Sequence, residues 1–393
     1  MILVSLAHIL TEEITTSKKA NPAKGQKPMT ILKMCRCPKT IRYTEKWKAF
    51  RRFGDSEPNY DAMKKYVILL LFGIFSSGFA QEPKLEVTGI RMENVKYPFP
   101  VKEINLNIQG QDLKMVYMDL QPQHPNGKNI LLLHGKNFSA MYWEQTANDL
   151  AKAGYRVIMP DQIGFGKSSK PGNIQYTFQL LAQNTKAILD ELKITKTNVL
   201  GHSMGGMLAT RFTLMYPETV EKLILENPIG LEDWKTVVPY QSVDDWYKTE
   251  LTQDYDKMKA YQLQFYYGGQ WKREYDKWIA APAGQTLDKD YAIVAKSSAL
   301  TYDMIFTQPV VYEFENIKVP TLLIIGQRDR TALEKGKAPK EVQETLGNYP
   351  ALGKSTAKKI LNSELVELDN VGHLPHIEAY DRFIAPLLAF LNK

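Results

Sequence analysis

Residues 199–207, with the sequence VLGHSMGGM, join an apolar run to an amphipathic one. Residues 197–203 are typical of a buried strand, and residues 204–217 are typical of a helix that stops at Pro217. G-x-S-x-G at such a junction predicts a sharp turn that lifts the serine hydroxyl above the sheet, toward the first N–H groups of the helix. We therefore predict that Ser203 is a nucleophile. The alternative is a serine that only caps the helix.

The sequence on both sides repeats this alternation of strand and helix. An alternating pattern in residues 101–108 and 113–120, separated by QGQD, predicts a hairpin. Continuous apolar runs predict strands buried on both faces at residues 129–135 and 155–161. Further strands are predicted at residues 197–203, 220–228, 319–329 and 363–373. Helical patterns fall at residues 142–154, 178–192, 204–217 and 380–393, with Gly154 as a C-cap. This order indicates an α/β fold with a mostly parallel sheet.

The alternation stops between residues 229 and 316, where no buried strand pattern occurs. Tryptophan and tyrosine are frequent in this stretch, so it is predicted to be a mainly helical insertion. We expect these aromatic side chains to pack the insertion onto the sheet domain and also to line an apolar substrate pocket.

A serine nucleophile needs a base, and the chain contains six histidines. The base should lie in a loop at the carboxyl end of a strand, far from Ser203 in the sequence. His373, which follows the last predicted strand, fits this requirement best, and His376 is expected to be structural or to lie at the rim. The remaining histidines fit it less well: His8, His124, His134 and His202.

The base in turn needs an acid that fixes its tautomer. Asp329 follows the buried strand in LLIIGQRDRT, and the order Ser203, Asp329, His373 is the one used by α/β hydrolases. The alternatives are that Asp329 is a solvated partner of a neighbouring arginine, and that Glu226 is the acid.

Backbone N–H groups should hold the oxyanion. We predict one from Met204, directly after the nucleophile, and one from HGKNF at residues 134–138. In that loop Lys136 is the first choice and Asn137 the second. The side chain of Lys136 is expected to be incidental.

These motifs resemble the α/β-hydrolase superfamily over residues 100–393. The resemblance rests on the HG turn, DQIGFGKS at residues 161–168, the serine turn, Asp329 and GHLPHIE at residues 372–378. It implies an eight-stranded, mostly parallel sheet with helices on both faces and a helical cap, residues 229–316, inserted after the sixth strand. It also implies structural roles for Asp161, Gly164, Gly166 and Glu378. No cofactor is expected, since the three catalytic residues perform acyl transfer unaided, and no metal motif such as H-E-x-x-H occurs.

The resemblance narrows the reaction. Epoxide hydrolases and haloalkane dehalogenases of this fold carry an aspartate in place of Ser203. Carbon–carbon hydrolases usually have Asn at position 202 and a glycine-rich oxyanion loop, and proline iminopeptidases have HGGPG, whereas this chain has His202 and HGKNFS. We expect an esterase or thioesterase acting on a small, partly apolar acyl group. The alternatives are a carbon–carbon hydrolase, an aminopeptidase of the same fold, and a non-catalytic binding protein.

The net charge of +7 belongs to the front of the chain. Residues 1–80 hold 14 of the 50 basic residues and 6 of the 43 acidic ones, so residues 81–393 have a net charge of −1. No basic stripe is left there for phosphates, which argues against a nucleic-acid partner. Both cysteines, Cys35 and Cys37, lie in the front segment without a second pair at zinc-site spacing.

Residues 63–80 have the three parts of a secretory signal peptide: Met-Lys-Lys, an apolar run of about ten residues, and small residues before a cleavage point after Ala80. Residues 1–62 are expected to be disordered or to be translated from an early start codon, and residues 81–393 to form the hydrolase domain. The predicted location is periplasmic or secreted, with no membrane span after cleavage. The alternatives for the apolar run are an uncleaved membrane anchor and a buried core helix.

Overall fold

The structure is a computed structural model that describes residues 85–393. The predicted signal peptide, residues 1–62 and both cysteines lie outside the described residues. Eight strands form one sheet in the order β1-β2-β4-β3-β5-β6-β7-β8. They are β1 (Val101–Ile108), β2 (Gln111–Leu120), β3 (Asn129–Leu133), β4 (Arg156–Asp161), β5 (Thr197–His202), β6 (Val220–Glu226), β7 (Thr321–Gly326) and β8 (Ser363–Leu368).

The β1/β2 and β2/β4 pairs are antiparallel, and the other pairs are parallel. The predicted eight-stranded, mostly parallel sheet is therefore confirmed. The β1–β2 hairpin closes through Gln109 and Gly110, which have φ of +50° and +81°. Positive φ at both central residues is the requirement of a two-residue hairpin turn whose twist matches the strands.

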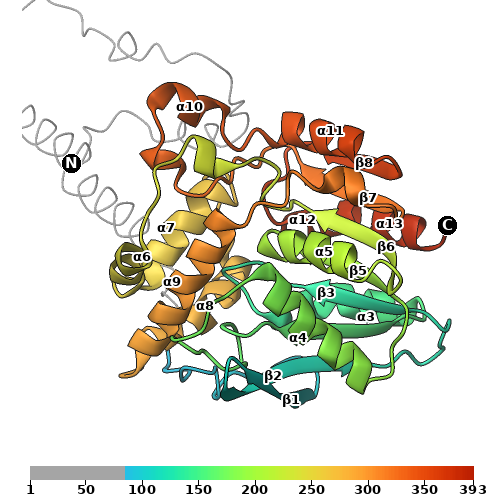
Figure 1. Ribbon diagram of the computed structural model, residues 1–393, viewed down its shortest axis with the longest axis horizontal. Helices are drawn as coiled ribbons and strands as arrows, with labels where there is room; N and C mark the ends of the chain where they lie inside the picture. Colours follow the sequence, from blue (N-terminus) through green and yellow to red (C-terminus); the bar gives the residue numbers. More distant parts are fainter. Residues whose placement is uncertain (1–84) are drawn as a thin grey trace, which may run out of the picture. The chain divides into compact units, whose positions relative to one another are not determined.

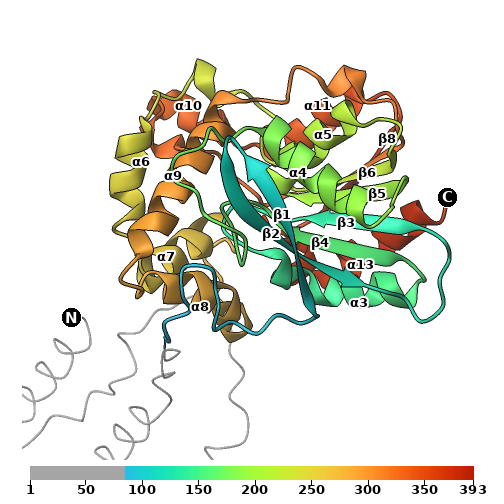
Figure 2. The same ribbon diagram turned by 60° about the horizontal axis from the view of Figure 1, so that its bottom comes forward.

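Successive residues of the parallel strands pack on opposite faces of the sheet. In β3, Leu131 and Leu133 belong to one buried cluster, and Ile130 and Leu132 belong to the other. Both clusters are apolar, which explains why these strands appear as unbroken apolar runs in the sequence. Helices cover each face (Figures 1 and 2). One side carries α4 (Phe178–Glu191), α5 (Met204–Met215) and α11 (Tyr349–Lys359), and the other carries α3 (Glu144–Lys152) and α13 (Tyr380–Leu391).

The helices of the sheet domain are α3 (Glu144–Lys152), α4 (Phe178–Glu191), α5 (Met204–Met215), α10 (Lys340–Thr345), α11 (Tyr349–Lys359), α12 (Pro375–Glu378) and α13 (Tyr380–Leu391), with short 3-10 helices η3 (Ala140–Trp143) and η7 (Lys335–Lys337). Gly154 ends α3 as predicted. Its φ is +92°, and the N–H of Tyr155 bonds the carbonyl of Leu150. His376 lies in the short helix α12, which precedes the last helix.

The described residues between β6 and β7 contain helices and no strand. They are η4 (Trp234–Thr236), α6 (Val243–Glu250), α7 (Tyr255–Phe265), η5 (Arg273–Tyr275), α8 (Asp276–Gln285), α9 (Tyr291–Thr307) and η6 (Phe314–Asn316). Side chains cap the N-termini of two of the α-helices: Ser242 accepts from the N–H of Asp245, and Asp254 accepts from the N–H of Lys257. The four α-helices group beside the sheet, beyond its strand ends (Figures 1 and 2). That this segment works as a cap stays a prediction.

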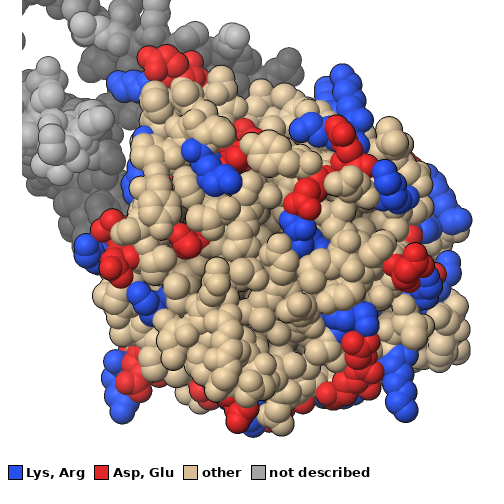
Figure 3. All heavy atoms as spheres, in the orientation of Figure 1, with Lys and Arg blue, Asp and Glu red and all other residues tan. Residues whose placement is uncertain are grey.

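Basic and acidic side chains are intermingled on the face shown in Figure 3, without a continuous basic stripe. Among residues 85–393, no helix is both long enough and apolar enough to cross a bilayer.

Candidate active site

Three side chains from distant parts of the sequence meet at the carboxyl ends of the strands. Ser203 follows β5, Asp329 lies three residues beyond β7, and His373 lies in the loop after β8. The Oγ of Ser203 is 2.9 Å from Nε2 of His373, and Nδ1 of His373 is 2.6 Å from Oδ2 of Asp329. All three are buried. The structure thus brings together the three residues that the sequence predicted as nucleophile, base and acid.

The turn at Ser203 has the backbone geometry that the sequence motif requires. Ser203 has φ of +56° and ψ of −122°, a conformation that costs a non-glycine residue conformational energy. A Cβ on Gly205 would overlap the carbonyl oxygen of Leu133, and a Cβ on Gly201 would overlap that of Gly205. The hydroxyl of Ser203 makes no capping bond to α5, so the helix-cap alternative is wrong.

Asp329 is held by donors other than the neighbouring arginines. Its Oδ2 accepts from Nδ2 of Asn227 at 2.8 Å, and its Oδ1 accepts from the N–H of Thr331 at 2.8 Å. The side chain of Arg328 pairs with Glu378, which also accepts from the N–H of Gly372. The solvated-aspartate alternative is therefore wrong, because Asp329 is fully buried and bonded to His373.

Glu226, the alternative acid, contacts a different histidine. Its Oε1 accepts from Nδ1 and from the backbone N–H of His376, both at 2.8 Å. Burial raises the pKa of Glu226 to about 7 and lowers that of His376 to about 3. Both groups are therefore largely uncharged in slightly acidic solution. The carboxylate of Glu226 is hydrogen-bonded to His376, whereas that of Asp329 is hydrogen-bonded to His373.

A second hydrogen-bonded chain runs behind the nucleophile. The carbonyl oxygen of His373 accepts from Nε2 of His202 at 2.8 Å, so Nδ1 of His202 is left to accept from the hydroxyl of Tyr142 at 3.0 Å. That hydroxyl accepts from the N–H of Gly135 at 2.9 Å. Burial lowers the pKa of His202 well below its usual 6.5, which keeps the ring neutral. Sequence reasoning missed this network.

The loop after β3 lies against the nucleophile. A Cβ on Gly135 would lie 3.1 Å from Cβ of Ser203. Among residues 85–393, the backbone N–H groups of Lys136 and Met204 have no hydrogen-bond acceptor, as expected for amides that bind a ligand. Their role in an oxyanion hole stays a prediction.

Tyr266, at the end of α7, covers the base. Its ring stacks on His373 with centroids 4.6 Å apart, and its carbonyl accepts from the N–H of His373 at 3.3 Å. Its hydroxyl accepts from Nδ2 of Asn137 at 2.8 Å. One side chain of the β6–β7 segment thus contacts both the base and the predicted oxyanion loop. The sequence signalled only that aromatic residues are frequent here.

The D-x-x-G-x-G loop is structural, as the resemblance implied. The carboxylate of Asp161 accepts from the hydroxyl of Tyr97 and from the backbone N–H groups of Ala140 and Lys167, each at 2.7 Å. Gly166 has φ of +49°, and a Cβ there would overlap that carboxylate. Asp161 therefore joins the loop to the start of η3.

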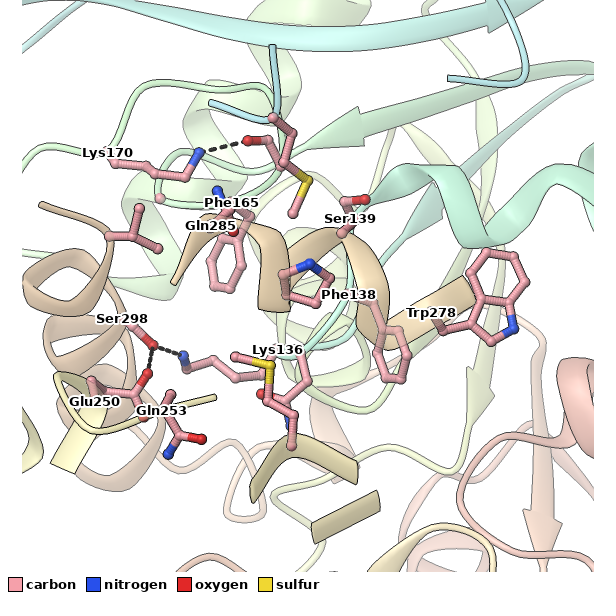
Figure 4. Close-up of a pocket in the computed structure, with 18 of the residues that line it drawn as sticks. Lys136, Phe138, Ser139, Phe165, Lys170, Glu250, Gln253, Trp278, Gln285 and Ser298 are labelled. Carbon is pink, nitrogen blue, oxygen red and sulfur yellow. Dashed lines mark hydrogen bonds between the residues drawn. The ribbon is translucent and has the colours of Figure 1, made fainter. Parts of the chain in front are cut away.

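A cavity of about 310 Å³ lies between these loops and helices α6–α9. Ser203 does not line it, but Lys136 and Asn137 do, and they belong to the loop whose Gly135 lies against Ser203. Phe138, Phe165 and Trp278 give it an aromatic wall (Figure 4). The side chain of Lys136, expected to be incidental, points into the cavity and donates to Ser298 at 2.6 Å.

In the part of the chain that the structure describes, no group of three or more His, Cys, Asp or Glu side chains is arranged to hold a metal ion. Of the other histidines, His134 accepts from the N–H of Gln162 at 3.1 Å and His124 is exposed, so neither reaches Ser203. His8 lies outside the described residues.

Comparison with known proteins agrees with this architecture. Residues 128–380 match the family model of the alpha/beta hydrolase fold, and the chain belongs to that family. The predictions of fold class and of an enzyme of this family are thereby confirmed.

A probable hydrolytic enzyme from Pseudomonas aeruginosa PAO1 has a crystal structure that matches 79% of this chain and 99% of its own, with 51% identity and a TM-score of 0.78. The enol-lactonase from Burkholderia xenovorans LB400 matches 74% of this chain and 100% of its own, with 22% identity and a TM-score of 0.56, which shows the fold alone.

A curated relative from Escherichia coli O81 (strain ED1a) is named 2-hydroxy-6-oxononadienedioate/2-hydroxy-6-oxononatrienedioate hydrolase. It is 35% identical over 147 residues, which are 37% of this chain and 46% of that protein. The chain thus matches less than half the length of this relative.

Proposed function

We propose that the protein is a serine hydrolase that cleaves a small ester or thioester through an acyl-enzyme. The observation that carries the proposal is the unbroken chain of contacts from Ser203 through His373 to Asp329. Hydrogen-bonded in this way, the serine can pass its proton to Nε2 as Oγ attacks a carbonyl carbon. Asp329 then stabilises the imidazolium.

The remaining steps use the same residues. The imidazolium returns the proton to the departing alkoxide or thiolate, which leaves the acyl group on Ser203. Water then attacks the acyl-enzyme, with His373 as base, and releases the carboxylic acid. The N–H groups of Met204 and Lys136 are proposed to bind the negative oxygen during both acylation and deacylation.

The test is a panel of p-nitrophenyl esters of increasing acyl length, assayed with the wild-type protein and with Ser203→Ala. We expect turnover of at least one short ester and its loss in the variant, with the fold unchanged by circular dichroism. If no ester is turned over and a fluorophosphonate does not label Ser203, the protein is a non-catalytic binding protein of this fold.

A second candidate is carbon–carbon bond hydrolysis of a carbonyl compound. The relative named 2-hydroxy-6-oxononadienedioate/2-hydroxy-6-oxononatrienedioate hydrolase favours it. Against it stand His202 and the HGKNFS loop. Assay with 2-hydroxy-6-oxononadienedioate separates the two, because the ester proposal predicts a far lower kcat/KM for that compound than for the best ester.

Export is proposed from the sequence of residues 63–80 alone. It is tested by expressing the full chain in a bacterial host and sequencing the N-terminus of the periplasmic product. A mature end at Gln81 supports cleavage, and a full-length product in the membrane fraction supports the anchor.

A further inference from the structure

Three lysines line the cavity: Lys136, Lys170 and Lys257, of which Lys257 lies 3.9 Å from Asp254. Within residues 85–393, the other two have no direct ion pair. Among residues 85–393, no carboxylate oxygen lies within 4.0 Å of either ammonium group. Buried ammonium groups are rare in proteins unless they are paired with an anion. A bound anion should therefore pair with at least one of the two ammonium groups.

The two lysines differ in how many donors are already used. The ammonium of Lys170 donates to two backbone carbonyls, those of Gly166 at 2.6 Å and Ser168 at 3.1 Å. That of Lys136 donates to one hydroxyl, that of Ser298, at 2.6 Å. An ammonium has three donors. Lys136 therefore has two N–H groups left for a ligand. It follows Gly135, where an added Cβ would lie 3.1 Å from Cβ of Ser203.

The surroundings of Lys136 keep its ammonium charged and in place. Burial lowers its pKa to about 8, and the charge of Glu250 opposes that shift. Ser298 connects the two, because its hydroxyl donates to Oε2 of Glu250 at 2.6 Å (Figure 4). The ammonium lies 3.9 Å from the ring centroid of Tyr302.

The rest of the cavity wall is mostly uncharged. Aromatic and methionine side chains line much of it, among them Phe138, Phe165, Met141 and Trp278. Such a wall suits an apolar chain, and the ammonium of Lys136, which has two unused donors, suits one negative group. A ligand that fills the cavity would have its anionic group on Lys136 and its apolar part along these rings.

Resting on the proposed function, we infer that the acyl substrate carries a carboxylate, which Lys136 binds while the scissile carbonyl lies at Ser203. The enzyme is then a hydrolase of half-esters of dicarboxylic acids. Lys136 acts twice in this site, through its backbone N–H at the oxyanion and through its side chain at the far end of the acyl chain. Hydrolysis releases the dicarboxylate and the alcohol.

The test compares two esters of equal acyl length in the same protein, the p-nitrophenyl monoester of glutaric acid and p-nitrophenyl pentanoate. We expect the wild-type full-length protein to have the higher kcat/KM for the monoester. The ratio of the two kcat/KM values should fall about 10- to 100-fold in Lys136→Met, as expected for the loss of a charge-assisted hydrogen bond. Taking the ratio cancels any effect of the substitution on the oxyanion loop.

Two further variants sharpen the result. Glu250→Gln removes the nearby negative charge and should raise the ratio. Lys289→Met makes the same charge change as Lys136→Met on an exposed residue and should leave the ratio unchanged. If Lys136→Met does not fold, the wild-type ratio and Glu250→Gln still decide.

A wild-type preference for the neutral ester, or a ratio that Lys136→Met and Glu250→Gln leave unchanged, would overturn the inference and leave the serine hydrolase standing. Absence of turnover of both esters together with absence of fluorophosphonate labelling of Ser203 would instead overturn the proposed function itself.

Discussion

The imidazole of His202 donates a hydrogen bond from Nε2 to the main-chain carbonyl of His373, 2.8 Å away. The residue next to the nucleophile thus holds the backbone of the residue that serves as base. Through Tyr142 the same imidazole is connected to Gly135 in the predicted oxyanion loop. Three loops that lie at Ser203 are joined by one neutral histidine.

Tyr142→Phe tests this connection. The substitution keeps the ring and removes the hydroxyl that serves His202 and the N–H of Gly135, so the ΔG of unfolding should fall by about 1–3 kcal/mol. If the hydroxyl positions the oxyanion loop, kcat should also fall, by about 10-fold or more. The control is Tyr155→Phe, which removes a buried hydroxyl that donates to Leu391 far from the site. It should lose similar stability and keep its kcat; equal activity in both variants would contradict the positioning role.

Asp329→Asn should lower kcat by about 10³- to 10⁴-fold with a native fold, because an amide at this position favours the wrong tautomer of the base. Glu226→Gln removes the carboxylate of the alternative acid. It should keep most of the turnover, since Glu226 contacts His376. Steady-state kinetics on the best ester compare the two. The reverse order of activities would make Glu226 the acid.

Gly205→Ala should lower the ΔG of unfolding by about 3 kcal/mol or more, because the new methyl group overlaps the carbonyl oxygen of Leu133. Gly336→Ala is the matched control, since no atom lies within 4 Å of the position of its Cβ. It should change stability by less than about 0.5 kcal/mol. Urea unfolding followed by circular dichroism measures both, and a neutral Gly205→Ala would show that the turn is looser than described.

The stability of the protein should depend on the ionisation of Glu226. Its folded pKa, about 7, lies above the ordinary 4.5, so the folded state holds the proton more tightly than the unfolded state does. This contribution is fully present below pH 4.5 and is lost as the pH rises through 7. Relative to wild type, Glu226→Gln should therefore gain stability between pH 4.5 and 7. The ΔG of unfolding of both proteins is measured by denaturation at several pH values. A difference between them that stays constant from pH 4.5 to 7 would contradict the raised pKa.

The sheet and the three central residues could be predicted because their signals are local. Strands buried on both faces must be apolar throughout, and the turn at Ser203 needs glycines at fixed spacing. Asp329 and His373 come shortly after predicted strands, and parallel strands bring their carboxyl ends to one edge. These features depend on short-range chemistry that a single sequence displays.

The contacts that complete the site were not predictable in this way. Asn227, which follows β6, donates to Asp329, which follows β7. Tyr266 stacks on His373 from the end of a helix whose path could not be predicted from the sequence. The side chain of Lys136 is held in the cavity by a hydrogen bond to Ser298, which is 162 residues away in the sequence. Such pairings depend on how the β6–β7 segment folds back over the sheet, and no spacing rule encodes that.

The central claim is that Ser203 is a nucleophile activated by His373. The direct measurement is reaction of the full-length protein with a fluorophosphonate, followed by peptide mass spectrometry, with Ser203→Ala and His373→Ala alongside. We predict a single adduct on Ser203, none in Ser203→Ala, and a labelling rate in His373→Ala reduced by about 10³-fold or more. Labelling of another residue, or an undiminished rate in His373→Ala, would contradict the account.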